Sequence, residues 1–294
     1  PRVRRQRQMC IRDSCYTAAV PSKIQTGEKI DRMMKKRYFA IPILAIALHF
    51  LLSNLLYFLV ERLVLDVFHI SPQQFMNYSY WGEILIYAVL ILVFFTLYKL
   101  LWRKEISEPR TATNFKDVLG SLVVGFGICG ISGLWIMLAE QLPSLQKSIE
   151  AMNAGAENIA GGNAFGTFMI AVIAAPIVEE ILFRGIVLRS MRKFAPAWAA
   201  ILISSVLFGV YHLNIVQAAY ATFMGIAAGI LYEKKRNLLF PILVHFANNL
   251  ITMLQGFAPS EVNELISIFI LIMIAPAGYV VCRSLRQGKR ADSM

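Results

Sequence analysis

The sequence predicts an all-α fold: a polytopic bundle of about eight transmembrane helices with both termini in the cytoplasm. Hydrophobic residues make up 57% of the chain and charged residues 16%, whereas about a quarter of the residues of soluble domains are charged. Apolar segments recur at the length of about 20 residues that crosses about 30 Å of hydrocarbon as a helix. Basic residues gather in alternate connections between these segments, as they do in membrane proteins.

The apolar segments account for most of the chain. They lie near 39–60, 80–102, 117–139, 164–188, 197–213, 215–232, 238–255 and 261–282. The first follows Lys35, Lys36 and Arg37, but it is too long for a signal peptide and no small-residue cleavage site follows it. The polar, Gly-rich stretch 143–163 has a weak helical period, which favours an external loop resting on the membrane surface.

The charges of the connections predict the orientation of the bundle. Clusters of Lys and Arg at 35–37, 99–110, 189–193, 234–236 and 283–290 all fall on one side, and the opposite connections carry mainly Asp and Glu. The basic side is expected to be cytoplasmic. The formal net charge is +11, but the clusters form no basic stripe interleaved with aromatic residues, so no nucleic-acid partner is expected.

The chain divides into four expected regions. Residues 4–14 have the sequence encoded by one reading frame of a common sequencing adapter, so 1–32 is expected to be non-native or disordered, with Met33 or Met34 as the native start. Two spans and a cytoplasmic loop occupy 33–116, a helical core occupies 117–282, and a basic cytoplasmic tail occupies 283–294. The four cysteines suggest no secreted-type disulfide framework.

The fourth apolar segment carries three charged residues. Its sequence AAPIVEEILFRG contains Glu179, Glu180 and Arg184, and a charge inside a span is costly unless it is paired or faces a wet cavity. Glu180 and Arg184 are four residues apart and can pair on one helical face. Glu179 is rotated by about 100° from that pair, which leaves its carboxylate free to act on something else.

The fifth and seventh segments add polar groups. FGVYHLN places Phe208 and His212 on one helical face, and LVHFANN does the same for His245 and Asn249, with Asn248 displaced around the helix. Each of these residues also has a structural explanation, because an intramembrane His or Asn often bonds another helix. Their occurrence on three separate helices favours convergence in the bundle interior.

The three motifs resemble the signatures of the Abi or CPBP family, which includes the eukaryotic CAAX prenyl endopeptidases. EEILFR is similar to EExxxR, FGVYH to FxxxH, and HFANN to HxxxN, in the family's order and on separate spans. The resemblance covers roughly residues 117–282 and implies an intramembrane peptidase. It implies that Glu179 and His212 activate a water, that His245 and Asn249 donate to the oxyanion, and that Glu180, Arg184 and Phe208 support them.

A metal is the alternative for the same residues. Glu179, His212 and His245 would supply the three ligands of a catalytic zinc site. HExxH is absent, and Asn249 suits an oxyanion better than zinc, because neutral amides are poor zinc ligands. No cofactor is therefore favoured. Counting residues from the cytoplasmic ends puts Glu179 and His245 about 10–15 Å deep. His212 falls nearer the external side of the membrane, unless its helix is tilted or is shorter than the segment 197–213.

The expected substrate is a peptide or a small membrane protein in the lipid bilayer of a cell membrane. The short loops and the Lys and Arg residues between the spans favour a bacterial plasma membrane. The resemblance extends to members linked to bacteriocin processing or self-immunity. Two other classes stay open. A non-catalytic immunity or scaffold protein would use the same polar groups to hold the bundle together. A proton-coupled transporter would use them as a relay, although the paired broken helices of two repeats are not found.

Overall fold

The structure is a computed structural model that describes residues 21–67, 69, 71–106, 113–160 and 163–291. Every regular element within these residues is a helix, so the prediction of an all-α fold is confirmed. The adapter-like residues 4–14, with Cys10 and Cys15, lie outside the described residues.

The helices follow one another through short connections. The N-terminal part comprises α1 (Pro21–Arg62), the π-helix η1 (Leu63–Val67), α2 (Pro72–Leu101) and α3 (Arg103–Ile106). The middle part comprises α4 (Phe115–Glu140), the 3₁₀-helix η2 (Pro143–Leu145), α5 (Gln146–Ala160), α6 (Ala164–Thr167), the π-helix η3 (Phe168–Ala174), α7 (Ala175–Glu180), the π-helix η4 (Ile181–Leu188) and α8 (Arg189–Met191). The C-terminal part comprises α9 (Ala197–Tyr211), α10 (Ile215–Lys235), α11 (Leu239–Phe257) and α12 (Ser260–Ala291).

Five stretches of helix are long and apolar enough to cross a membrane. They are Arg37–Asp66, Ser79–Leu101, Phe115–Glu140, Ile215–Lys235 and Ser260–Arg286. The expected span 197–213 is the shorter apolar helix α9, and 164–188 is divided among α6, η3, α7 and η4. The segment 238–255 lies in α11, which carries the His-Asn motif. The total of eight spans stays a prediction.

Two regions differ from their expected form. The stretch 143–163, expected to be an external loop, contains the helix α5, whose Ile149 is buried against Ala139 and Val216. The expected basic tail 283–294 continues α12 as a helix to Ala291. Helical hydrogen bonding extends into both regions, although neither is a continuous apolar segment.

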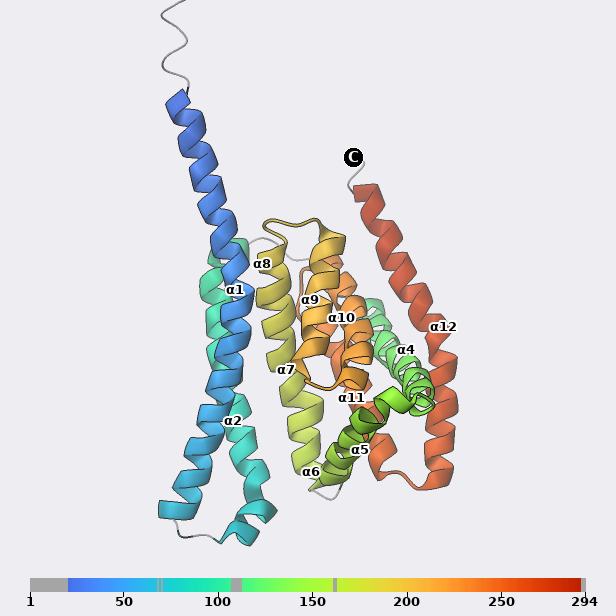
Figure 1. Ribbon diagram of the computed structural model, residues 1–294. Coiled ribbons are helices and arrows are strands. Elements are labelled where there is room, and N and C mark those ends of the chain that lie inside the picture. The colour runs from blue at the N-terminus through green and yellow to red at the C-terminus, as the bar shows by residue number, and fades with distance from the viewer. Residues whose placement is uncertain (1–20, 68, 70, 107–112, 161–162, 292–294) are drawn as a thin grey trace, which may run out of the picture.

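Figure 1 shows α1 and α2 side by side at one flank, α9, α10 and α11 in the centre, and α12 at the other flank next to α4. The start of α1 and the end of α12 lie at the same end of the bundle. Ion pairs tie three of the basic clusters together at an end of the bundle. Glu105 pairs with Arg189 and Lys193, and Arg192 pairs with Glu233. This grouping agrees with basic loops on one side of a membrane.

The helix α4 approaches its neighbours through glycines. A Cβ on Gly125 would lie 2.3 Å from the carbonyl oxygen of Val244 in α11, and one on Gly127 would lie 2.7 Å from that of Met273 in α12. Both neighbours are backbone and cannot rotate away. Glycine at these positions therefore sets how closely α11, which carries His245, lies against the bundle.

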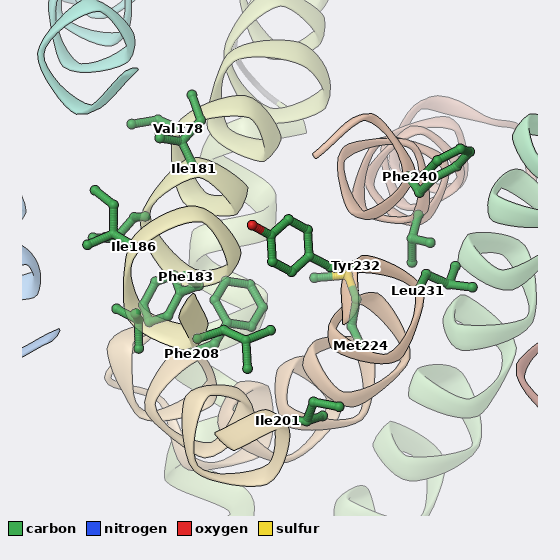
Figure 2. Packing of buried hydrophobic residues seen from close by; sticks show 14 of the residues in the cluster. Val178, Ile181, Phe183, Ile186, Ile201, Phe208, Met224, Leu231, Tyr232 and Phe240 are labelled. Atoms are coloured by element: carbon green, nitrogen blue, oxygen red, sulfur yellow. The ribbon is translucent and has the colours of Figure 1, made fainter. Parts of the chain in front are cut away.

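The apolar core surrounds the helix that carries the carboxylates. Phe183 and Phe208 are fully buried, and their rings meet edge to face with centroids 4.9 Å apart. Figure 2 shows these rings from η4 and α9 facing Tyr232 and Met224 of α10 across the core. Aromatic pairs in this geometry add about 0.5–1.5 kcal/mol beyond their area burial. Apolar side chains of η4, α9 and α10 thus pack around the helix that carries the acidic motif.

Candidate active site

The helix that carries the two glutamates is interrupted by π-helical turns on both sides. Pro176 lies in the first turn of α7 and has no N–H to donate. Before it, the Ala175 N–H bonds to the Ile170 carbonyl, five residues back. After Glu180 the chain enters η4. Such wide turns are rare and often mark functional sites; here they flank Glu179 and Glu180.

Glu180, Arg184 and His245 form a buried hydrogen-bonded cluster. Arg184 Nη1 donates to Glu180 Oε1 over 2.7 Å, as the sequence spacing predicts, and the two side chains are 1% and 0% exposed. The same Glu180 oxygen lies 3.1 Å from His245 Nδ1. Since a carboxylate accepts, His245 Nδ1–H is the donor of this bond. Arg184 also lies over the Phe208 ring, 4.7 Å from its centroid.

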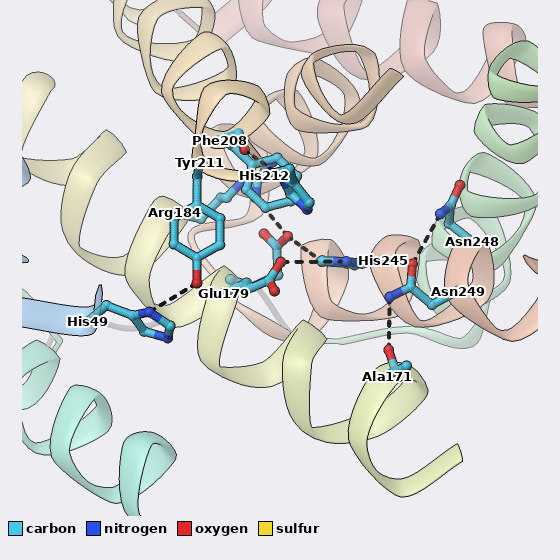
Figure 3. Close-up of polar contacts among 11 residues, drawn as sticks. His49, Ala171, Glu179, Arg184, Phe208, Tyr211, His212, His245, Asn248 and Asn249 are labelled. Atoms are coloured by element: carbon cyan, nitrogen blue, oxygen red, sulfur yellow. Dashed lines mark hydrogen bonds and ion pairs between the residues drawn. The ribbon is translucent and has the colours of Figure 1, made fainter. Parts of the chain in front are cut away.

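Glu179 approaches the other nitrogen of the same imidazole. Its Oε2 lies 3.9 Å from His245 Nε2 and is a buried atom with no hydrogen-bond partner among the described residues. The side chain is 13% exposed, unlike that of Glu180. His245 is therefore set between two carboxylates, one bonded to it and one still available (Figure 3).

His212 lies at the end of α9, where its imidazole contacts Phe208. Its Nδ1 is 2.9 Å from the Phe208 carbonyl oxygen, and because a carbonyl only accepts, Nδ1 carries the proton. Nε2 then presents its lone pair. The Phe208 ring contacts both imidazoles, with centroids 4.9 Å from His212 and 5.7 Å from His245. The two histidines therefore border the same part of the interior.

A tight helical hairpin holds His212 at this level. At about 1.5 Å per residue, the 15-residue helix α9 spans about 22 Å, less than the about 30 Å of a hydrocarbon core. Leu213 turns the chain with a positive φ of 56°, and Asn214 caps α10. Ser148 of α5 hydrogen-bonds Asn214 and thereby covers the turn. The helix α9 thus ends two residues before the expected limit of the span 197–213.

Asn249 lies one helical turn beyond His245 and has different partners. Its Nδ2 donates to the Ala171 carbonyl in η3 over 2.8 Å, and its Oδ1 accepts from Asn248 over 3.1 Å. Within the described residues no hydrogen bond joins it to the glutamates or histidines of the site. One N–H of its amide group remains for another acceptor. Figure 3 shows Asn249 at the edge of the cluster.

The residues of the alternative zinc site do not form a ligand group. Over the described residues, no group of three or more His, Cys, Asp or Glu side chains is placed to hold a metal ion. His245 Nδ1 is engaged by Glu180, and His212 Nδ1 by the Phe208 carbonyl.

Sequence reasoning missed two residues beside the site. His49 in α1 is 5% exposed, and its Nδ1 lies 2.9 Å from the hydroxyl of Tyr211, the residue before His212. The sequence contained a signal for His49, because an ionisable residue inside the first span is a candidate functional residue by default. The first two spans were interpreted for topology alone.

The fold and the site define a multi-pass helical membrane protein with a buried Glu, Arg and His cluster. Residues 161–251 match the family model described as type II CAAX prenyl endopeptidase Rce1-like. Over 91 residues the chain is 31% identical to a protein named "Putative membrane peptidase YdiL" from Bacillus subtilis (strain 168). No solved structure shows a significant match.

The matched segment contains all three motifs. This segment is similar to the Rce1-like endopeptidases, in agreement with the resemblance of the three motifs to the Abi/CPBP family. The alignment spans 31% of this chain and 37% of the relative's length. Helices α1, α2, α4 and α12 lie outside the matched residues.

Proposed function

We propose that this protein is an intramembrane endopeptidase of the CAAX-protease type, in which Glu179 is the general base. The observation that carries the proposal is the placement of His245 between two carboxylates, with Glu180 bonded and Glu179 Oε2 unpartnered 3.9 Å away. Arg184 secures Glu180. The two glutamates therefore have different tasks, one positioning His245 and the other taking a proton.

Hydrolysis assigns a step to each of these groups. Glu179 takes a proton from water, aided by the lone pair of His212 Nε2, and the oxygen attacks the peptide carbonyl carbon. The carbonyl π electrons move to oxygen, and the oxyanion accepts hydrogen bonds from His245 Nε2–H and the remaining Asn249 N–H. The C–N bond then breaks, and the proton held by Glu179 passes to the leaving amine.

This role requires His245 to carry two ring protons. Its Nδ1–H is donated to Glu180, so Nε2 can donate to substrate only when it is protonated as well. In that state Arg184 and His245 balance the charges of Glu179 and Glu180. A neutral four-residue cluster suits an apolar interior, where an unpaired charge is costly.

The substrate we propose is a peptide segment of a membrane protein or a membrane-bound peptide. The test compares peptides released by membranes containing the wild-type chain, Glu179→Gln or Glu150→Gln, the last being an exposed carboxylate of α5. A farnesylated fluorogenic peptide ending in a CAAX sequence, and its unprenylated form, serve as defined probes.

Wild type and Glu150→Gln should release the same peptides, and Glu179→Gln should lower the cleavage rate by about 10²–10⁴-fold at equal abundance. Cleavage that persists in Glu179→Gln would contradict the assignment of the base. Protection of cells by Glu179→Gln in an immunity assay would instead support a non-catalytic scaffold.

A further inference from the structure

A second polar contact reaches the site from helix α1, outside the segment matched to the family. His49 Nδ1 lies 2.9 Å from the Tyr211 hydroxyl, and the two rings meet edge to face with centroids 5.5 Å apart. Tyr211 also contacts His212, with centroids 5.6 Å apart. One residue therefore connects α1 to the turn that holds His212 (Figure 3).

Tyr211 is fixed in place by the rings around it. Phe50 of α1 lies 4.8 Å and Phe183 of η4 lies 5.3 Å from its ring, centroid to centroid. Phe94 of α2 packs against His49 at 5.4 Å. These contacts restrict the phenol ring, so its hydroxyl has a defined position.

His49 is a buried side chain that bonds the Tyr211 hydroxyl through Nδ1. The other nitrogen of His49, Nε2, is buried and has no hydrogen-bond partner among the described residues. Among the described residues, the bond to Tyr211 is therefore the one hydrogen bond of this imidazole, and its loss would leave both ring nitrogens of a buried side chain without a partner.

We propose that His49 and Tyr211 are positioning residues of the active site, and that the bond between them holds the end of α9 in the place from which His212 acts. This inference rests on the proposed function for its kinetic consequence. It makes α1 a part of the site and not only an accessory span.

The structural test uses the full-length chain in lipid nanodiscs with ¹⁵N-labelled histidine rings. The chain has four histidines, and single replacements assign their signals. The ring signals of His49 should shift in Tyr211→Phe, and those of His212 should shift in His49→Phe. Phe58→Leu, a change on the exposed face of α1, should leave both sets of signals in place. A His49 signal unaffected by Tyr211→Phe, or a His212 signal unaffected by His49→Phe, would overturn the proposal.

The kinetic test uses the CAAX probe or a substrate released by wild-type membranes. His49→Phe and Tyr211→Phe should each lower kcat by about 10–100-fold with KM unchanged, and the double variant should be no worse than the poorer single variant. Phe58→Leu, on the exposed face of α1, should keep the wild-type kcat. Full activity of His49→Phe, or losses that multiply in the double variant, would refute the positioning role while cleavage by the wild type stands. If the wild type cleaves nothing, the proposed function is refuted. The NMR signals of the histidine rings still test the contact between His49 and Tyr211.

Discussion

The two sides of the imidazole of His245 differ in burial and in the partners they meet. On the Nδ1 side, Glu180 and Arg184 are 0% and 1% exposed and bonded to each other. On the Nε2 side, Glu179 is 13% exposed and has a carboxylate oxygen without a hydrogen-bond partner among the described residues. Glu180 Oε2 also lacks a hydrogen-bond partner among the described residues, so the two adjacent carboxylates differ in exposure and in ion pairing.

This difference separates stability from reactivity. A buried, ion-paired charge is costly to disturb, because removing its partner leaves an uncompensated ion in an apolar interior. A partly exposed carboxylate can meet water and substrate. The Glu180 side is therefore expected to hold the site together, and the Glu179 side to react.

The largest effect on folding is expected from Arg184→Leu. It leaves Glu180 buried without its cation, which should destabilise the protein by about 3–5 kcal/mol, together with loss of the contact with Phe208. Thermal unfolding and abundance in membranes measure this effect. The matched control is Arg62→Leu, because Arg62 pairs with Asp66 at the same i,i+4 spacing but both side chains are 59% exposed. A similar small change in both variants would remove the distinction between the two sides.

Asn249→Ala should act on catalysis and leave folding largely intact. Loss of one oxyanion donor is expected to lower kcat by about 10²–10³-fold. Asn249 also bonds the Ala171 carbonyl, so the melting temperature must be measured with the rate. Asn54→Ala is the control, since within the part of the chain that the structure describes its amide bonds the Phe50 carbonyl alone, on the exposed face of α1. If Asn249→Ala keeps the wild-type kcat, Asn249 has a structural role and no role in catalysis.

Sequence patterns predicted the local parts of the site better than the contacts between distant helices. Glu180 and Arg184 pair as their four-residue spacing indicates, because an i,i+4 contact depends on helix geometry alone. The bond from His245 to Glu180 spans 65 positions and depends on how α11 packs, which no local pattern specifies. Asn249 shows the same limit, since its partner Ala171 contributes only a backbone carbonyl.

The fold was predictable to a similar degree. Long apolar segments became helices, since each can bond its own backbone within the membrane. The π-helical turns beside Pro176 were not expected, because they depend on which carbonyl the neighbouring N–H groups reach. His49 was overlooked because its partner, Tyr211, lies 162 positions away.

Gly209→Ala should disturb the hairpin that carries His212. A Cβ at Gly209 would lie 2.3 Å from the Ala218 carbonyl oxygen and from Thr222 Oγ1, so α9 and α10 must separate. A destabilisation of about 1–3 kcal/mol is expected, with lower activity because His212 moves. Gly133→Ala is the control, because its Cβ would meet nothing within 4 Å. Equal stability in both variants would show that the hairpin tolerates wider spacing.

The smallest effect is expected at the basic end of the bundle, where Glu105 pairs with Arg189 and Lys193. Burial alone would raise the pKa of Glu105, but the hydrogen bond from Lys193 and the two positive charges lower it below its ordinary value of 4.5. A carboxylate with a lowered pKa stabilises the folded state above its unfolded pKa and loses this contribution as the pH falls through the folded value.

Glu105→Gln should therefore lower the free energy of unfolding by about 0.2–1 kcal/mol per lost pair at pH 7. The difference from wild type should shrink as the pH drops below 4.5, and high salt should reduce it, because the partners are partly exposed. Unfolding measured across this pH range tests the prediction, and a difference that persists at pH 3 would assign the contribution of Glu105 to packing. The cleavage rate at pH 7 should stay that of the wild type, since Glu105 is no part of the His245 cluster.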